Sequence, residues 1–115
     1  MATIQISKSK AESGLHVVAA RRSELSELCR EFHILRLELF GSALSSAFDF
    51  EHSDLDFLVE FQPLQPGDYA TAFFSFKEAL ERLFERPVDL VVASAIRNPY
   101  FRRSIEQSKA LLYAA

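Results

Sequence analysis

The spacing of apolar side chains predicts three strands in the middle of the chain. Residues 34–40 alternate three leucines, the first of them Leu35, with polar or aromatic residues, which indicates a strand with one mostly buried face. Residues 54–61 alternate in the same way and place four apolar side chains on one face. Residues 87–92 are apolar apart from Asp89 and indicate a third strand. The pattern leaves open whether the first two strands pair antiparallel.

Apolar residues at three- and four-residue spacing predict three helices. Ser23 is the expected N-cap of the first, which ends near His33 and has an alternative start near Leu15. The second covers residues 69–84, with apolar side chains along one face and charged ones along the other. The third begins at an Asn-Pro cap and ends near Ser108.

The order of these elements predicts an α+β fold with a small mixed sheet flanked by helices, which we expect on one side of the sheet. Residues 1–14 show little periodicity and are expected to form an N-terminal arm, with a short edge strand at residues 3–7 as the alternative. Residues 15–115 are long enough for one hydrophobic core and are expected to form one domain.

Composition narrows the classes of partner. The chain carries 13 basic and 16 acidic side chains, a formal charge of −3, so we expect no direct nucleic-acid binding. Cys29 is the only cysteine, which fits a reducing compartment. No apolar stretch approaches the roughly 20 residues that a membrane span needs. We therefore expect a cytoplasmic protein without a membrane partner.

A turn of small residues leads from the first strand toward two carboxylates. Gly41 permits a positive φ and a close approach to the backbone, while Ser42 adds a hydroxyl and an N–H that suit phosphate oxygens. Asp54 and Asp56 share a strand face, where repulsion and desolvation disfavour the ionised pair unless a divalent cation lies between them. Mg²⁺ suits this pair of carboxylates, because it commonly binds one or two carboxylates together with substrate phosphates. A D-x-D pair alone is a weak motif, and two solvated carboxylates are the alternative.

Asp89 adds a third carboxylate. An isolated aspartate in an apolar strand is unfavourable unless it is paired or bound to a metal. If its strand pairs beside the strand of Asp54 and Asp56, the three carboxylates converge on one or two cations. Asp89 is then a further metal ligand and a general base toward an acceptor hydroxyl.

The ordered set of Gly41-Ser42, eleven residues, Asp54-x-Asp56 and a later strand with Asp89 resembles the nucleotidyltransferase superfamily of the DNA polymerase β type. More narrowly, it is similar to the minimal nucleotidyltransferases, or MNT domains, whose best-described members are antitoxins paired with HEPN-domain toxins. The closing segment, residues 97–113, is similar to the last helix and strand of that group.

The resemblance implies a nucleotidyltransferase fold and the transfer of AMP from ATP to a tyrosine hydroxyl of a partner HEPN toxin, in a hetero-oligomer with that toxin. It implies Mg²⁺, with two ions possible, and ATP as the donor. The three aspartates would then be catalytic residues and metal ligands, and Gly41 and Ser42 would bind the nucleotide. Transfer to a small molecule is a further alternative, but it needs an additional substrate domain.

The loop after Gly41-Ser42 departs from the family pattern. Family members usually carry a basic residue there, whereas residues 43–53 contain no Lys or Arg and include Asp49 and Glu51. Arg102 or Arg103 of the last helix can supply the missing charge, although a solvated helix face is the alternative for that pair. The departure motivates a second hypothesis, a non-catalytic antitoxin that neutralises the toxin by forming a complex.

Overall fold

A computed structural model describes residues 14–45, 48–49 and 52–115. The helices and strands are α3 (Gly14–Ala19), α4 (Arg22–Glu31), β1 (Ile34–Phe40), β2 (Leu55–Phe61), α5 (Tyr69–Phe84), β3 (Val88–Val92), α6 (Pro99–Gln107) and β4 (Lys109–Ala114). The expected arm lies outside the described residues apart from Gly14, where α3 begins. Ser23 is not the N-cap of α4, because that helix already begins at Arg22. No described helix is both long enough and apolar enough to span a membrane.

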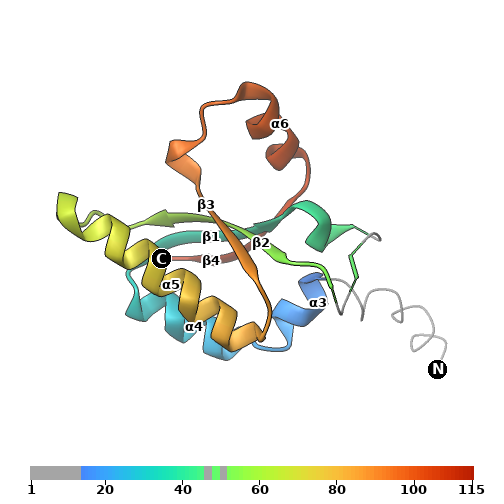
Figure 1. Cartoon of the computed structure of the whole chain (residues 1–115), viewed down its shortest axis with the longest axis horizontal. Coiled ribbons are helices and arrows are strands. Elements are labelled where there is room, and N and C mark those ends of the chain that lie inside the picture. The colour runs from blue at the N-terminus through green and yellow to red at the C-terminus, as the bar shows by residue number, and fades with distance from the viewer. Residues whose placement is uncertain (1–13, 46–47, 50–51) are drawn as a thin grey trace.

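The strands form one mixed sheet in the order β3-β2-β1-β4 (Figure 1). Strand β1 pairs antiparallel with β2 and with β4, and β3 pairs parallel with β2. The α+β prediction with a small mixed sheet is therefore confirmed, and the open question about the first two strands is answered as antiparallel. Among the strands that the structure describes, β3 and β4 are therefore the two edges of the sheet.

Helices α4 and α5 cover one face of the sheet, as Figure 1 shows. The main core lies between these two helices and the sheet. The alternation in β2 and the apolar stripe of α5 meet there: the ring of Phe57 stacks on Phe84 at a centroid distance of 5.9 Å, and Phe61 meets Phe76 edge-on at 6.3 Å. Burying each such ring contributes roughly 1.5–3 kcal/mol. Strand β2, which carries Asp56, is therefore packed firmly against α5.

Helix α6 lies across the sheet from α4 and α5, so the prediction of helices on one side was wrong (Figure 1). Its Ile105 packs with Ile96, Phe40 and Leu58 in a second, smaller cluster. The predicted cap is confirmed, because the Asn98 side chain accepts hydrogen bonds from two backbone N–H groups of the first helical turn. This face therefore has an apolar cluster under α6.

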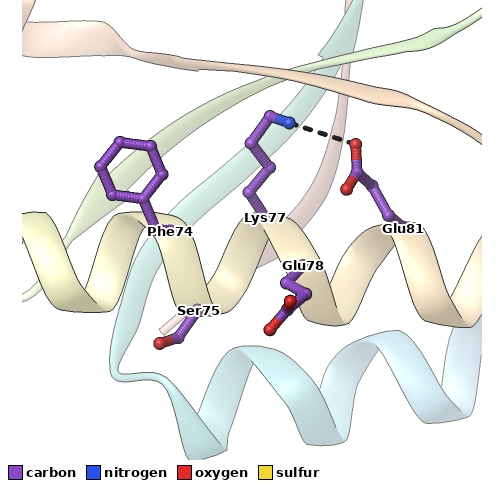
Figure 2. Close-up of a pocket in the computed structure, with 5 residues that line it drawn as sticks. All are labelled: Phe74, Ser75, Lys77, Glu78 and Glu81. Carbon is purple, nitrogen blue, oxygen red and sulfur yellow. Dashed lines mark hydrogen bonds and ion pairs between the residues drawn. The ribbon is translucent and has the colours of Figure 1, made fainter.

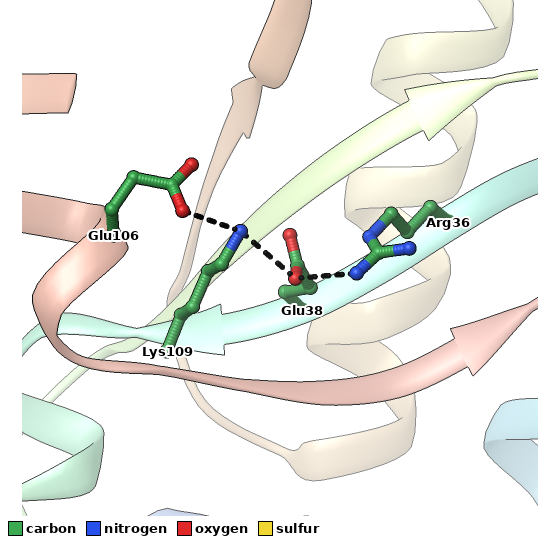
Figure 3. Close-up of polar contacts among 4 residues, drawn as sticks. All are labelled: Arg36, Glu38, Glu106 and Lys109. Atoms are coloured by element: carbon green, nitrogen blue, oxygen red, sulfur yellow. Dashed lines mark hydrogen bonds and ion pairs between the residues drawn. The ribbon is translucent and has the colours of Figure 1, made fainter.

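Strand β1 departs from simple alternation. A register shift at its start turns Leu35 outward, so that this side chain is 44% exposed rather than buried. Glu38 is instead buried at 4% exposure. Its carboxylate accepts hydrogen bonds from Arg36 and from Lys109, each at 3.3 Å, and Lys109 also pairs with Glu106 at 3.1 Å (Figure 3). A buried charge is costly unless it is paired, and these ion pairs satisfy the Glu38 carboxylate. They also connect the end of α6 and the start of β4 to β1 in the middle of the sheet.

Candidate active site at the start of β2 and β3

Two of the three predicted carboxylates are direct neighbours in the sheet. Asp56 of β2 lies opposite Asp89 of β3 in the parallel pair. Phe40 lies opposite Asp56 on the other side, in the antiparallel pair of β1 and β2. Since Phe40 and Leu58 belong to the cluster under α6, Asp56 faces the same side of the sheet as that helix. Asp54 comes one residue before β2 begins, so the predicted strand started one residue too early.

The three carboxylates differ in exposure. Asp56 is half-buried, whereas Asp54 and Asp89 are exposed. Asp89 lies between the buried residues Val88 and Leu90, but its own side chain is exposed, so the cost predicted for an isolated charge in an apolar strand does not apply to it. Burial therefore disfavours the charged form of Asp56 more than that of Asp54 or Asp89.

Asp56 is the electrostatically unusual member of the set. Burial, with the negative charges of Asp89 and Asp54 adding to it, raises the pKa of Asp56 from 3.8 to about 6. Among the described residues no group of three or more His, Cys, Asp or Glu forms a metal site of its own. The donor set still fits Mg²⁺, because that ion commonly takes one or two carboxylates and completes its shell with water and substrate phosphates. A bound cation also offsets the repulsion from Asp89 and Asp54, which adds to the effect of burial on the pKa of Asp56.

The Gly41 turn lies directly against this carboxylate. Gly41 has φ +74°, and a Cβ atom added there would lie 2.6 Å from Oδ2 of Asp56. Only glycine fits this position without displacing the carboxylate. The next residue, Ser42, is exposed, and Ala43 packs so closely on Gly14 of α3 that a Cβ at Gly14 would lie 2.5 Å from the Ala43 Cβ. Helix α3 therefore supports the turn from beneath.

Arg86 holds the segment that enters the site, a role that sequence reasoning missed. Its Nη1 donates to the carbonyl of Ser53 at 3.4 Å, and its guanidinium lies 5.5 Å from the centre of the Phe48 ring. Ser53 also accepts a hydrogen bond at Oγ from the Asp49 N–H at 2.9 Å. These contacts fix the backbone just before Asp54. The only sequence signal was a basic residue shortly before the strand of Asp89.

The two arginines considered as phosphate ligands belong to α6. Arg102 donates from Nη2 to the carbonyl of Ile96 at 2.8 Å, so its guanidinium is used to hold the loop before that helix. Arg103 is exposed. The structure thus gives Arg102 a local structural role.

Comparison with known proteins assigns the chain to a family. The model of the nucleotidyltransferase domain family matches residues 22–112, which include α4, α5, α6, the first three strands and the first part of β4. This chain belongs to that nucleotidyltransferase family. Membership identifies it as an enzyme of the nucleotidyltransferase class.

Relatives narrow the family to its small members. A Methanocaldococcus jannaschii protein named "Putative protein adenylyltransferase MJ0128" is 38% identical over 80 residues, which cover 70% of this chain and 78% of that protein. A solved structure described as a "putative minimal nucleotidyltransferase" is 29% identical, with a TM-score of 0.67, and the match covers 83% of this chain and 92% of that chain. The resemblance to minimal nucleotidyltransferases is confirmed.

A third comparison finds the same fold in a chain of a toxin–antitoxin complex. A structure of a tri-AMPylated HEPN toxin of Shewanella oneidensis in complex with an MNT antitoxin has a TM-score of 0.58 to this chain. The match covers 84% of this chain and 72% of that chain at 18% identity. Similarity at this level shows a shared fold and nothing further.

Replacing Gly41 by alanine is expected to lower both stability and nucleotide transfer. The left-handed backbone strains any residue with a Cβ by about 1–2 kcal/mol, and the added atom pushes the Asp56 carboxylate aside. Urea unfolding and the initial rate of transfer measure the two effects, and we expect about a tenfold loss of rate. Gly67→Ala is the matched control, since its added Cβ meets no atom within 4 Å. Equal behaviour of the two variants would contradict the prediction.

Proposed function

We propose that this chain transfers AMP from ATP to a tyrosine hydroxyl of a partner HEPN-domain toxin and thereby acts as its antitoxin. The observation that carries the proposal is the adjacency of Asp56 and Asp89 on neighbouring strands, with the Gly41 turn against Asp56. The adenylyltransferase relative and the fold shared with an antitoxin bound to an AMPylated HEPN toxin support the choice of donor and partner.

In this proposal Asp54 and Asp56 bind one or two Mg²⁺ ions, and Asp89 is a further ligand. When bound, the ion supplies charge neutralisation at the phosphates of ATP and fixes their orientation. Gly41 presents its backbone to the phosphates without a side chain in between, and Ser42 donates hydrogen bonds from its N–H and hydroxyl. Residues 43–53 contain no Lys or Arg, so binding of the nucleotide depends more than usual on the cation.

Asp89 is the proposed general base. It is exposed on an edge strand, where a hydroxyl from another protein can reach it. Its carboxylate takes the proton of the tyrosine hydroxyl as the phenolic oxygen attacks the α-phosphorus of ATP. The new bond joins that oxygen to phosphorus, the bond to the bridging oxygen breaks, and pyrophosphate leaves. The products are an AMP-tyrosine ester and pyrophosphate.

The test is the intact mass of the HEPN-domain protein after incubation with this chain, ATP and Mg²⁺. Added mass in steps of one AMP, located on a tyrosine by peptide mass spectrometry, is the expected result. No added mass, with the complex intact and the toxin inhibited, overturns transfer and favours the second candidate, an antitoxin that acts by binding alone. The loop without Lys or Arg is the observation that favours that candidate.

A further inference from the structure

We propose that the outer edge of β3 is the docking site for the HEPN-domain partner, which adds an extended apolar segment with an acidic side chain to the sheet beside Asp89. The identity of the partner rests on the proposed function. The site itself rests on the backbone of β3, on a groove next to it and on the side chains that line that groove.

The backbone of β3 has hydrogen-bonding groups that point away from the sheet. Strand β3 is the outermost strand, and its ladder with β2 begins where the Leu55 N–H donates to the Pro87 carbonyl at 3.3 Å. Backbone groups of successive residues point to opposite sides of a strand. The N–H and C=O groups of Leu90 and Val92 therefore point outward, away from β2, and can pair with a further strand.

The start of this edge is covered and its end is not. The Val88 N–H, which also points outward, donates to Glu81 of α5 at 3.1 Å, and Lys77 pairs with Glu81 at 3.1 Å (Figure 2). Donation by the Val88 N–H and by Lys77 lowers the pKa of Glu81, so this cover is a carboxylate at neutral pH. Charged side chains of this kind protect sheet edges against unwanted pairing. The protection stops before Leu90.

Beyond Glu81 the edge opens into an apolar groove of about 470 Å³ between α5 and α6. It is lined by side chains and backbone of both helices, of β3 and of the loop that follows it, including Phe73, Val92, Ile96, Arg97 and Phe101. Figure 1 shows β3 between α5 and α6. Two of the lining residues are aromatic, and one of them, Phe101, is 41% exposed. The other, Phe73, packs edge-on against Phe74, which is 66% exposed and lines a neighbouring hollow along α5 (Figure 2). Exposed aromatic side chains around a groove are typical of protein-binding surfaces.

The chemistry of the groove selects its occupant. Outward backbone groups favour an extended segment, and apolar walls favour apolar side chains at alternate positions. Arg97 is exposed and is the only charged residue in the lining, so it favours an acidic side chain on the partner. Because β3 is outermost and carries Asp89, a segment added there brings the acceptor protein next to the proposed base.

Two variants test the site without altering the catalytic residues. Val92→Pro removes an outward N–H that the ladder does not use, and the backbone of Val92, at φ −83°, is close to the value of about −65° that proline prefers. Phe101→Ala removes a ring that lines the groove and is 41% exposed. We expect each to weaken binding of the HEPN-domain protein at least tenfold in titration calorimetry. Leu111→Ala, at the opposite edge and 54% exposed, is the matched control and is expected to change affinity less than twofold.

Hydrogen exchange of the wild-type chain supplies an independent readout, because pairing should slow exchange at the amides of Leu90 and Val92 when the HEPN-domain protein binds. Equal affinity of all variants, or no binding by the wild type, overturns the proposal. A dimer of this chain alone that Val92→Pro dissociates also overturns it, because a second copy then occupies the edge. Groove-dependent binding without AMP transfer supports the docking site and disproves the proposed function. AMP transfer that these variants do not change supports the proposed function and disproves the docking site.

Discussion

Replacing Asp56 by asparagine is expected to lower the rate of AMP transfer at least a thousandfold, which corresponds to about 4 kcal/mol of transition-state stabilisation. Asparagine keeps the size of the side chain and removes its negative charge, and a neutral amide is a poor ligand for Mg²⁺. Asp54→Asn should act in the same way, since the two residues are proposed to hold the same cation. The measurement is the initial rate of AMP incorporation into the HEPN-domain protein at saturating ATP and Mg²⁺.

Asp68→Asn is the matched control for this prediction. It makes the same change of charge at an exposed position just before α5, where its side chain caps no backbone N–H. Its rate should stay within twofold of wild type. Both active-site variants should still bind the HEPN-domain protein, because neither residue lines the groove at β3. A rate for Asp56→Asn close to that of Asp68→Asn would contradict the metal-binding role.

Inhibition of the toxin by Asp56→Asn separates the two candidate functions. If AMP transfer silences the toxin, the variant binds the toxin and leaves it active. If binding alone silences it, the variant inhibits as well as the wild type does. The loop after Ser42 makes this comparison informative, because its lack of basic residues is the one departure from the family pattern that affects nucleotide binding directly.

Alternation along β2 was enough to predict which of its residues share a face. The D-x-D pattern placed Asp56 with Leu58, and the cluster under α6 confirms that side of β2. The apolar stripe of α5 was also predicted correctly, with Phe76, Leu80 and Phe84 all buried. Such predictions succeed because they depend only on periodicity within one element.

Features that depend on contacts between distant segments were not predictable in this way. Periodicity shows which side of α6 is apolar, but not which face of the sheet that side covers. The burial of Glu38 depends on Lys109, far along the chain, and the exposure of Leu35 follows from a register shift that no local pattern marks. The position of β3 at the edge of the sheet likewise follows from the strand order, which no local pattern gives.

The same Asp56→Asn variant is expected to be more stable than the wild type when no metal is present. In the unfolded chain the carboxyl titrates near its ordinary pKa of 3.8, and in the folded chain its pKa is about 6. Between these values the unfolded state has released a proton that the folded state keeps, so the stability of the wild type falls as pH rises and the loss is complete above about pH 6. Asparagine does not titrate and escapes this loss.

Urea unfolding in the presence of a chelator, from pH 4.5 to 7.5, measures the difference. A shift of this size corresponds to at most about 3 kcal/mol, and the partial exposure of Asp56 reduces the expected gain to about 1–2 kcal/mol at pH 7.5. The gain should shrink toward pH 4.5. Asp68→Asn should show no such pH-dependent gain, because Asp68 is exposed and is not among the charges that raise the pKa of Asp56.

Adding saturating Mg²⁺ should reverse the order of the two proteins. A cation that binds only the folded wild type stabilises it by mass action, whereas Asp56→Asn has lost a ligand and gains little. The reversal would link the repulsion around Asp56 to a cation, since a carboxylate that was merely half-buried would remain destabilising with or without the ion. A gain that persists unchanged in Mg²⁺, or one that does not depend on pH, would show that Asp56 is a strained structural residue and would remove the support that its raised pKa lends to a metal site.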